Sequence, residues 1–198
     1  MAISASLVKD LRERTGAGMM ACKKALAEAN GDIERAIDLL RQQGAMRAAA
    51  KAGRTAAQGV IYSYIHPGEQ LGVLVELNCE TDFVARTDPF RELAKHLAMQ
   101  VAATQVLAVD REGLDPGYLQ REREIALEQA RASGKPEAVV QKIVEGKIEK
   151  LYEEVCLLEQ PFIRDPERKV RDLLTDAVSQ MGENIVVRRF AKFRVGEN

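Results

Sequence analysis

Apolar and polar residues alternate with the period of a β-strand near the middle of the chain. Between residues 71 and 77 every second position carries an aliphatic side chain, which is typical of a strand with one buried face. A β-rich run at residues 60–65 precedes this segment, and the Pro-Gly pair at 67–68 favours a turn between them. The sequence therefore predicts a β-hairpin over residues 59–79. A third strand, predicted over residues 185–195, can pair with it as an antiparallel sheet.

The front of the chain, residues 1–44, has the apolar spacing of three short helices. Gly16 and Gly31 mark the ends of the first two. Asp32 is suited to cap the third, which is predicted to end at Gly44. The face that this third helix is expected to bury consists of Ile33, Ala36, Ile37 and Leu40. Three helices in so few residues predict a small helical bundle with a small core.

Residues 41–54 are rich in alanine and basic residues and contain no acidic residue. Alanine favours helix, so this stretch is predicted to be a basic helical connector. Its charges are suited to a solvated helix face or to contact with RNA or an acidic protein surface. The absence of interleaved aromatic residues, which would stack on bases, favours the solvated face.

Helical periodicity dominates the second half of the chain. Asp88-Pro89 is predicted to start a long helix, two more polar helices follow Pro116 and Pro136, and Pro161 and Pro166 bracket a turn before a last helix. The long helix is expected to bury Phe90, Leu93, Ala94, Leu97 and Val101. The helix after Pro136 is expected to pack its stripe against a core, a sister helix or another subunit, through Val140, Ile143, Val144, Ile148 and Leu151. Strands without single crossover helices between them indicate the α+β class.

Composition limits the classes of partner. Hydrophobic residues make up 46% of the 198 residues and charged residues 30%, as in globular proteins. A formal charge of −1 gives no bulk attraction to nucleic acid or anionic lipid, and no apolar run has the length of a membrane span. Three widely spaced cysteines without a CxxC pair argue against a zinc site or a disulfide framework. We expect a cytoplasmic protein that binds neither nucleic acid nor membrane directly and needs no cofactor.

The residues that follow the second predicted strand are the main candidate site. Thr81, Asp82 and Phe83 break the alternation directly after the strand. In one interpretation Thr81 caps a helix, Asp82 is a first-turn acid and Phe83 is a core residue. In the other, Phe83 is a wedge that enters a pocket of another molecule while Asp82 disturbs a cation or phosphate site there. A similar choice applies to Met19 and Met20, which either complete the helical core or form an adaptable contact surface.

Signals for catalysis are weak. Cys79 with His66 and Asp82 is the best arrangement for a nucleophile, but none of the three lies in a recognisable catalytic motif. Gly16 and Gly18 form a lone Gly-x-Gly without the strand or the Lys of a phosphate-binding loop. These patterns favour a protein that acts by binding another protein over an enzyme. The rival function, from another class, is a plain helical adaptor.

Four blocks of the sequence are distinctive: LRERTGAGMMACKKAL at 11–26, NCETDFVAR at 78–86, LEQPF at 158–162 and GENIVVRRF at 182–190. In this order they resemble one known family, the bacterial translation elongation factor Ts proteins. The resemblance implies a three-helix ubiquitin-associated-like domain at residues 1–54 with its basic connector, followed by an α+β core at residues 55–198 with a small antiparallel sheet packed by helices. It also implies a nucleotide-exchange factor, not an enzyme, for the GTPase elongation factor Tu. Longer members carry a second core subdomain, so the resemblance allows a homodimer of this shorter chain.

The same resemblance assigns roles to individual residues. It implies that Thr81, Asp82, Phe83 and Val84 match the TDFV segment that displaces Mg²⁺ from the GTPase. It further implies that the front domain grips the nucleotide-binding domain of elongation factor Tu. The residues that it brings to this grip are Arg12, Met19 and Met20. Ala21 departs from the pattern, since many relatives carry an acidic residue there, which leaves one local polar contact open.

Overall fold

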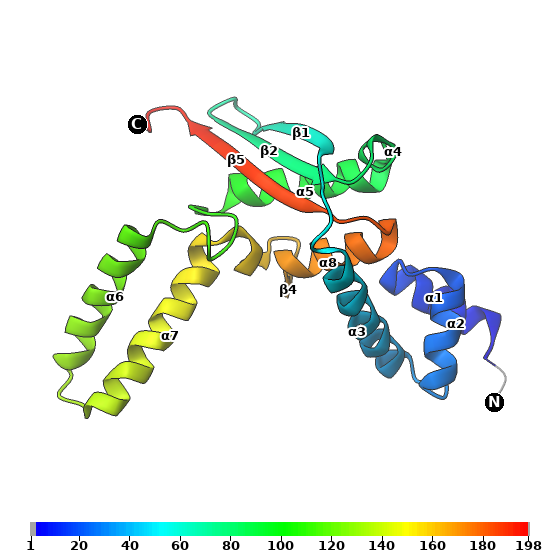
Figure 1. Ribbon diagram of the computed structural model, residues 1–198, viewed down its shortest axis with the longest axis horizontal. Coiled ribbons are helices and arrows are strands. Elements are labelled where there is room, and N and C mark those ends of the chain that lie inside the picture. The colour runs from blue at the N-terminus through cyan, green and yellow to red at the C-terminus, as the bar shows by residue number, and fades with distance from the viewer. Residues whose placement is uncertain (1–2, 198) are drawn as a thin grey trace. The chain divides into compact units, whose positions relative to one another are not determined.

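A computed structural model of the chain describes residues 3–197, which contain eight α-helices, one short 3-10 helix and five strands (Figure 1). In chain order the elements are α1 (Ala5–Thr15), α2 (Met19–Glu28), α3 (Ile33–Lys51), β1 (Gln58–Ile65), β2 (Leu71–Cys79), α4 (Asp82–Ala85), α5 (Asp88–Ala103), α6 (Pro116–Arg131), α7 (Glu137–Val155), η1 (Leu157–Glu159), β3 (Pro161–Phe162), β4 (Asp165–Lys169), α8 (Val170–Met181) and β5 (Val186–Arg194). The fold is of the predicted α+β class.

The chain packs as two compact units, each built from separate stretches of sequence. The first unit takes the residues up to Gly59 together with Asn78–Arg91 and Leu173–Val186. The second takes Val60–Leu77, Glu92–Asp172 and the residues from Val187 onward. The predicted division at residue 54 stays a prediction.

Helices α1 to α3 of the first unit form the small bundle that the sequence predicts. The Ser4 hydroxyl accepts the Leu7 N–H at 3.2 Å to cap α1, and Gly16, with φ of 66°, ends that helix in the left-handed region. The Asp32 carboxylate accepts the Arg35 N–H at 3.1 Å at the start of α3. Seven buried side chains form the core of this bundle: Val8, Leu11, Cys22, Ala25, Leu26, Ala29 and Ala36.

Helix α3 does not end at Gly44, as the sequence predicts, but continues to Lys51. Gly44 is buried, and a Cβ placed on it would lie 3.6 Å from the Ser179 hydroxyl of α8. A glycine inside a helix costs about 1 kcal/mol relative to alanine. Packing against α8 and the alanine-rich residues 48–50 offset this cost, so most of the predicted basic connector is the second half of α3.

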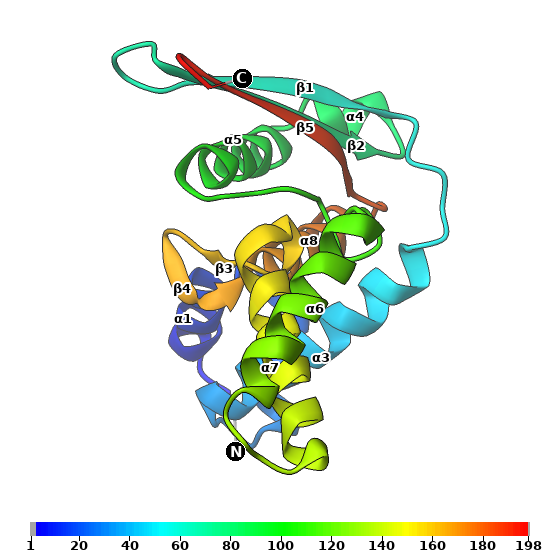
Figure 2. The ribbon, with the colours of Figure 1, turned by 90° about the vertical axis from the view of Figure 1, so that its left-hand side faces the viewer.

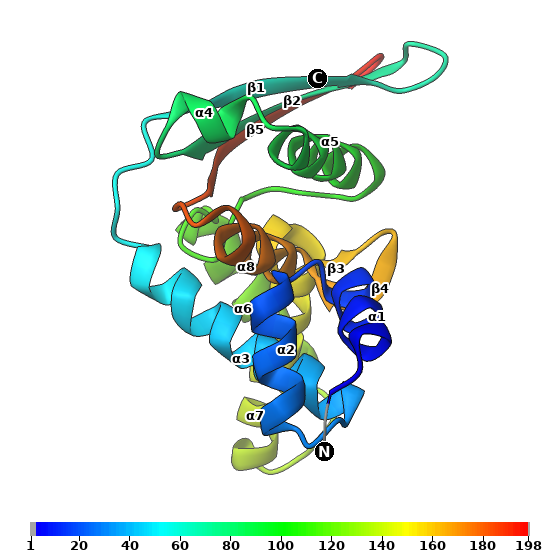
Figure 3. The ribbon, with the colours of Figure 1, turned by 90° about the vertical axis from the view of Figure 1, so that its right-hand side faces the viewer.

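The sheet, which lies mostly in the second unit, has the strand order β1-β2-β5. β1 and β2 form the predicted hairpin, whose turn is closed by the His66 N–H donating to the Leu71 carbonyl at 2.9 Å. Gly68 and Glu69 adopt φ values of 91° and 57° in this turn. Residues 92–103 of α5 cover one face of the sheet (Figures 2 and 3). The predicted stripe of α5 is confirmed, with Phe90, Leu93, Ala94, Leu97 and Val101 all buried.

Helices α6 and α7 lie side by side as an antiparallel pair within the second unit (Figure 1). The stripe predicted on α7 therefore packs on a sister helix, and its most buried members are Val140, Val144 and Ile148. Next to the C-terminal end of α7, the buried Glu159 carboxylate of η1 forms ion pairs with Arg111 at 2.7 Å, Lys169 at 3.5 Å and Arg171. These ion pairs link the segments that flank α6 and α7, and we call this region the base of the helical pair.

The turn predicted between Pro161 and Pro166 joins two short antiparallel strands. Pro161 of β3 pairs with Lys169 of β4, and Phe162 pairs with Asp165. Pro166 lies within β4 and not at the edge of the turn. Within residues 3–197, no helix combines the length and apolarity that a membrane span requires.

Candidate functional site

The candidate segment begins where β2 ends. Thr81 has extended backbone angles, and its hydroxyl accepts the Val84 N–H at 3.4 Å, which makes it the N-cap of the one-turn helix α4. Asp82 is the first residue of that helix, and Ala85 is its buried residue. One half of the first interpretation is thus confirmed, since Thr81 caps a helix and Asp82 lies in its first turn.

Phe83 is not a core residue, so the other half of that interpretation is wrong. Its side chain is 79% exposed, whereas Phe90, seven positions later in the same unit, is fully buried. The core therefore takes one aromatic ring from this region and leaves the other in solvent, with Val84 half-buried beside it. The exposed ring is therefore free to contact another molecule.

Asp82 has a partner that sequence reasoning missed. Its carboxylate lies 2.8 Å from the Arg86 guanidinium, four residues on, and the two side chains are 47% and 78% exposed. Exposed pairs at this spacing contribute only about 0.3–0.5 kcal/mol. The i,i+4 spacing of Asp82 and Arg86 could have revealed this ion pair in the sequence. In the free protein Arg86 therefore offsets the charge of Asp82, and the pair is easily opened.

Glu183, also missed from the sequence, holds the start of α4. Its carboxylate accepts the N–H groups of Glu80 and Thr81 at 3.0 Å each and the Thr81 hydroxyl at 2.6 Å. The Glu80 carboxylate accepts the Asn184 N–H at 2.7 Å, and this bond, aided by Arg54, lowers the pKa of Glu80 below its ordinary value. No local pattern could reveal these contacts, because 102 residues separate Glu183 from Thr81.

Cys79, the candidate nucleophile, has its thiol engaged in a hydrogen bond. The Cys79 thiol donates to the Thr81 carbonyl at 3.1 Å, and burial raises its pKa, which disfavours the reactive thiolate. His66 pairs with the Tyr64 hydroxyl at 3.0 Å. This arrangement gives no support to Cys79 as a catalytic nucleophile. In the part of the chain that the structure describes, no three His, Cys, Asp or Glu side chains gather as a metal-binding group.

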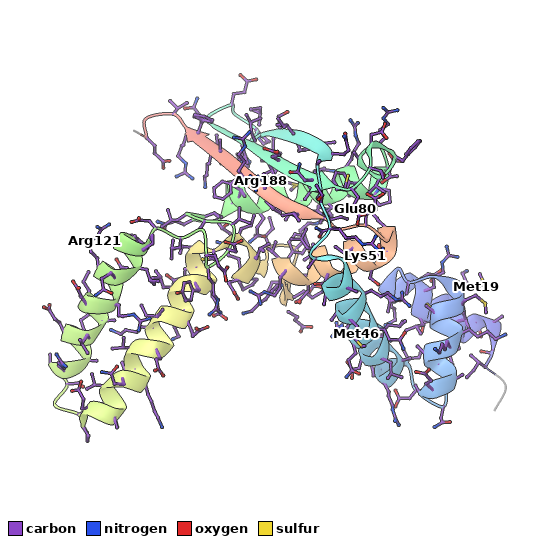
Figure 4. All side chains as sticks on the ribbon, in the orientation of Figure 1. Met19, Met46, Lys51, Glu80, Arg121 and Arg188 are labelled. Carbon is purple, nitrogen blue, oxygen red and sulfur yellow. The ribbon has the colours of Figure 1, made fainter. Side chains whose placement is uncertain are left out.

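The second candidate surface lies on the front helices. Met19 and Met20 open α2 and are 60% and 76% exposed, so the core interpretation is wrong for both. The core positions of α2 are filled by Cys22, Ala25 and Leu26. Arg12 of α1 is also exposed. Figure 4 shows Met19 at the outer side of the bundle.

Both candidate surfaces belong to the first compact unit. Residues 81–84 are held together by α4, whereas Arg12, Met19 and Met20 lie on α1 and α2, apart from α4 in two perpendicular views (Figures 1 and 3). The unit therefore presents two separate exposed surfaces, one apolar and aromatic and the other rich in methionine.

Comparison with known proteins identifies the family. A family model described as elongation factor TS matches residues 33–197. The chain belongs to the elongation factor Ts family. Elongation factor Ts of Thermoanaerobacter sp. (strain X514) is 58% identical over 195 residues, covering 98% of this chain and 96% of the relative. Elongation factor Ts of Nitratidesulfovibrio vulgaris is 55% identical over 196 residues, covering 99% and 98%, and that of Carboxydothermus hydrogenoformans is 56% identical over 195 residues, covering 98% and 90%.

Membership in the elongation factor Ts family confirms the resemblance that the four sequence blocks indicated. It makes the chain a factor of translation elongation, within protein biosynthesis. The matches extend over nearly the whole chain and nearly the whole of each relative, so both compact units belong to the shared architecture.

Proposed function

We propose that the chain is the guanine-nucleotide exchange factor of elongation factor Tu, the translational GTPase. It binds the GDP-bound GTPase, displaces Mg²⁺ and promotes GDP release, so that GTP can rebind during polypeptide elongation. The factor acts by binding and not as an enzyme, in the cytoplasm, and without direct contact to nucleic acid. Family membership supports the partner, and the exposed Phe83 ring is the observation that carries the mechanism.

The two exposed surfaces divide the work in this proposal. Arg12, Met19 and Met20 anchor the nucleotide-binding domain of the GTPase, and residues 81–84 act near its phosphate site. Flexible, polarizable methionines suit a contact that must follow a partner through a conformational change. Separation of the two surfaces on one folded unit allows the anchor to stay bound while α4 applies strain.

Exchange requires that factor and nucleotide weaken each other's binding to the GTPase by the same factor. Two routes are open at residues 81–84: the Asp82 carboxylate disturbs the ligands of Mg²⁺, or the Phe83 ring displaces a segment that holds them. Arg86 already offsets the charge of Asp82, whereas Phe83 is exposed and ready to enter a pocket. These observations favour the Phe83 route. Loss of the ion leaves the GDP phosphates under-neutralised and speeds their departure.

The test is release of fluorescent GDP from elongation factor Tu, measured with and without the chain and with and without excess EDTA. We expect the chain to accelerate release in Mg²⁺, and we expect EDTA to remove most of this advantage. No acceleration at saturating chain would overturn the proposal. Binding to the GTPase without acceleration would make the chain an adaptor, and an advantage that survives EDTA would place the strain elsewhere on the nucleotide.

A homodimer is part of the same proposal, supported by the outer face of the sheet. Ile61, Ile65, Leu74 and Phe193 are exposed on its strands, and within the second unit the figures show no helix over the face opposite α5 (Figures 2 and 3). An apolar face of this kind is suited to a second copy of the chain, which presents the same surface. Light scattering should give the mass of two chains for the wild type and of one for Phe193→Glu. A monomeric wild type at micromolar concentration would rule out the dimer.

A further inference from the structure

The loop between α8 and β5 meets the start of α4 through two carboxylates that exchange backbone contacts. Glu183 accepts the N–H groups of Glu80 and Thr81, and Glu80 accepts the N–H of Asn184 at 2.7 Å. Each segment therefore caps the other. Gly182, with φ of 74°, ends α8 in the left-handed region and turns the chain toward this contact.

Thr81 transmits the contact to α4. Its hydroxyl donates to Glu183 at 2.6 Å and accepts from the Val84 N–H, so the same oxygen joins the carboxylate to the cap of the helix. A helix of four residues has no independent stability. Phe83, at 79% exposed, has little packing of its own to fix its direction. The direction of the ring therefore depends on how residues 80–84 are held.

The same loop also holds the end of α3. The Asn184 side-chain amide donates to the Arg54 carbonyl at 2.7 Å and to the Ala52 carbonyl at 3.4 Å. The Arg54 guanidinium reaches the Glu80 carboxylate at 3.4 Å, and Figure 4 shows Glu80 beside the end of α3. All these residues lie in the first compact unit. We call this set, Ala52, Arg54, Glu80, Thr81, Glu183 and Asn184, the carboxylate clamp.

We propose that Glu183 is a positioning residue for nucleotide exchange: through Thr81 it fixes the direction of Phe83 relative to α3 and the front helices. The inference rests on the proposed function and deepens it. Glu183 touches neither nucleotide nor metal in this scheme. It acts through Phe83, whose ring can strain the partner only if residues 80–84 stay fixed.

The experiment compares Glu183→Ala and Glu183→Gln in the GDP-release assay, titrated to saturation so that affinity and maximal rate separate. Glu183→Ala should lower the maximal rate about tenfold or more, while affinity for the nucleotide-free GTPase changes less than about threefold. Glu183→Gln keeps the length and one acceptor oxygen, and should recover most of the rate. Glu149→Ala, which removes the two hydrogen bonds to Arg111 in the other unit, is the control for lost stability and should keep the wild-type maximal rate.

A double mutant separates positioning from an independent role. If Glu183 acts through Phe83, Glu183→Ala combined with Phe83→Ala should release GDP no more slowly than Phe83→Ala alone. A double mutant that shows the product of the two single effects would overturn the proposal. A wild-type maximal rate in Glu183→Ala would overturn it as well.

Amide hydrogen exchange on the free chain keeps this inference separate from the proposed function. Glu183→Ala should speed exchange at the N–H groups of Glu80, Thr81 and Val84, and Glu183→Gln should do so less. If the wild-type chain fails to accelerate GDP release, the proposed function fails, and faster amide exchange would still support the clamp. Unchanged amide exchange in Glu183→Ala would overturn the clamp whatever the release assay shows.

Discussion

Replacing Phe83 by alanine removes an exposed ring with little cost to the fold. Burying a whole phenylalanine side chain contributes about 1.5–3 kcal/mol. Because 79% of this side chain is exposed in the free protein, insertion into a partner can gain about four-fifths of that, or roughly 1.2–2.4 kcal/mol. If the ring is buried when GDP leaves, Phe83→Ala should slow stimulated release by roughly 8- to 60-fold. The free energy of unfolding should change by less than about 0.5 kcal/mol, since the ring makes few contacts within its own chain.

The assay is stopped-flow release of fluorescent GDP from elongation factor Tu at matched occupancy of the factor. Phe83→Leu should be intermediate, and Ile125→Ala, which removes a 48% exposed side chain of α6 in the other unit, should match the wild type. Asp82→Asn breaks the pair with Arg86 but keeps the ring, so it should cost less than Phe83→Ala. Release as fast as wild type with Phe83→Ala would refute the reasoning, and a larger loss with Asp82→Asn would move the effect to the carboxylate.

Two further predictions concern the anchor and the base of the helical pair. Met19→Ala combined with Met20→Ala should weaken association with the GTPase by about tenfold or more. The control, Met46→Ala, at a methionine 74% exposed on α3, should leave the affinity unchanged. Calorimetry measures both affinities, and equal losses would refute the anchoring role of Met19 and Met20. The Arg111 hydrogen bond lowers the pKa of Glu159 below its ordinary 4.5, so its stabilising effect is complete above that value and disappears as the pH falls through the lower, folded-state pKa. Urea unfolding should therefore lose stability below about pH 4, less steeply in Glu159→Gln, and parallel pH profiles would contradict this.

Local pattern was sufficient for most of the elements. The hairpin and its turn, the start of α5 at Asp88 and the packing face of α7 all follow from periods of two or 3.6 and from the placement of proline and glycine. These signals are strong because one face of each element is buried. Gly44 failed as a helix end because its neighbour is α8, and contact between distant segments is not encoded in local spacing.

The candidate site was only partly predictable for the same reason. Pattern alone predicted that Phe90 is buried but left open whether Phe83 joins the core, since helical periodicity covers the first ring and not the second. Pattern alone also left open whether Met19 and Met20 complete the core, and both are exposed because Cys22, Ala25 and Leu26 already fill the core positions of α2. The resemblance to a family supplied what spacing could not. Glu183 escaped both approaches, since its contacts close a loop of a hundred residues.

The uninterrupted course of α3 through Gly44 sets the register between the anchor and the carboxylate clamp. Nineteen helical residues run from the capped start at Ile33 to Lys51, next to the clamp. Each residue of a helix adds a rotation of about 100° and a rise of about 1.5 Å. A single alanine inserted in α3 would therefore rotate the front helices relative to Phe83. The contacts within the front bundle and within the carboxylate clamp would be kept. Insertions or deletions in α3 would therefore be tolerated only near a whole number of helical turns, because only these keep the anchor residues and the Phe83 ring facing the same partner.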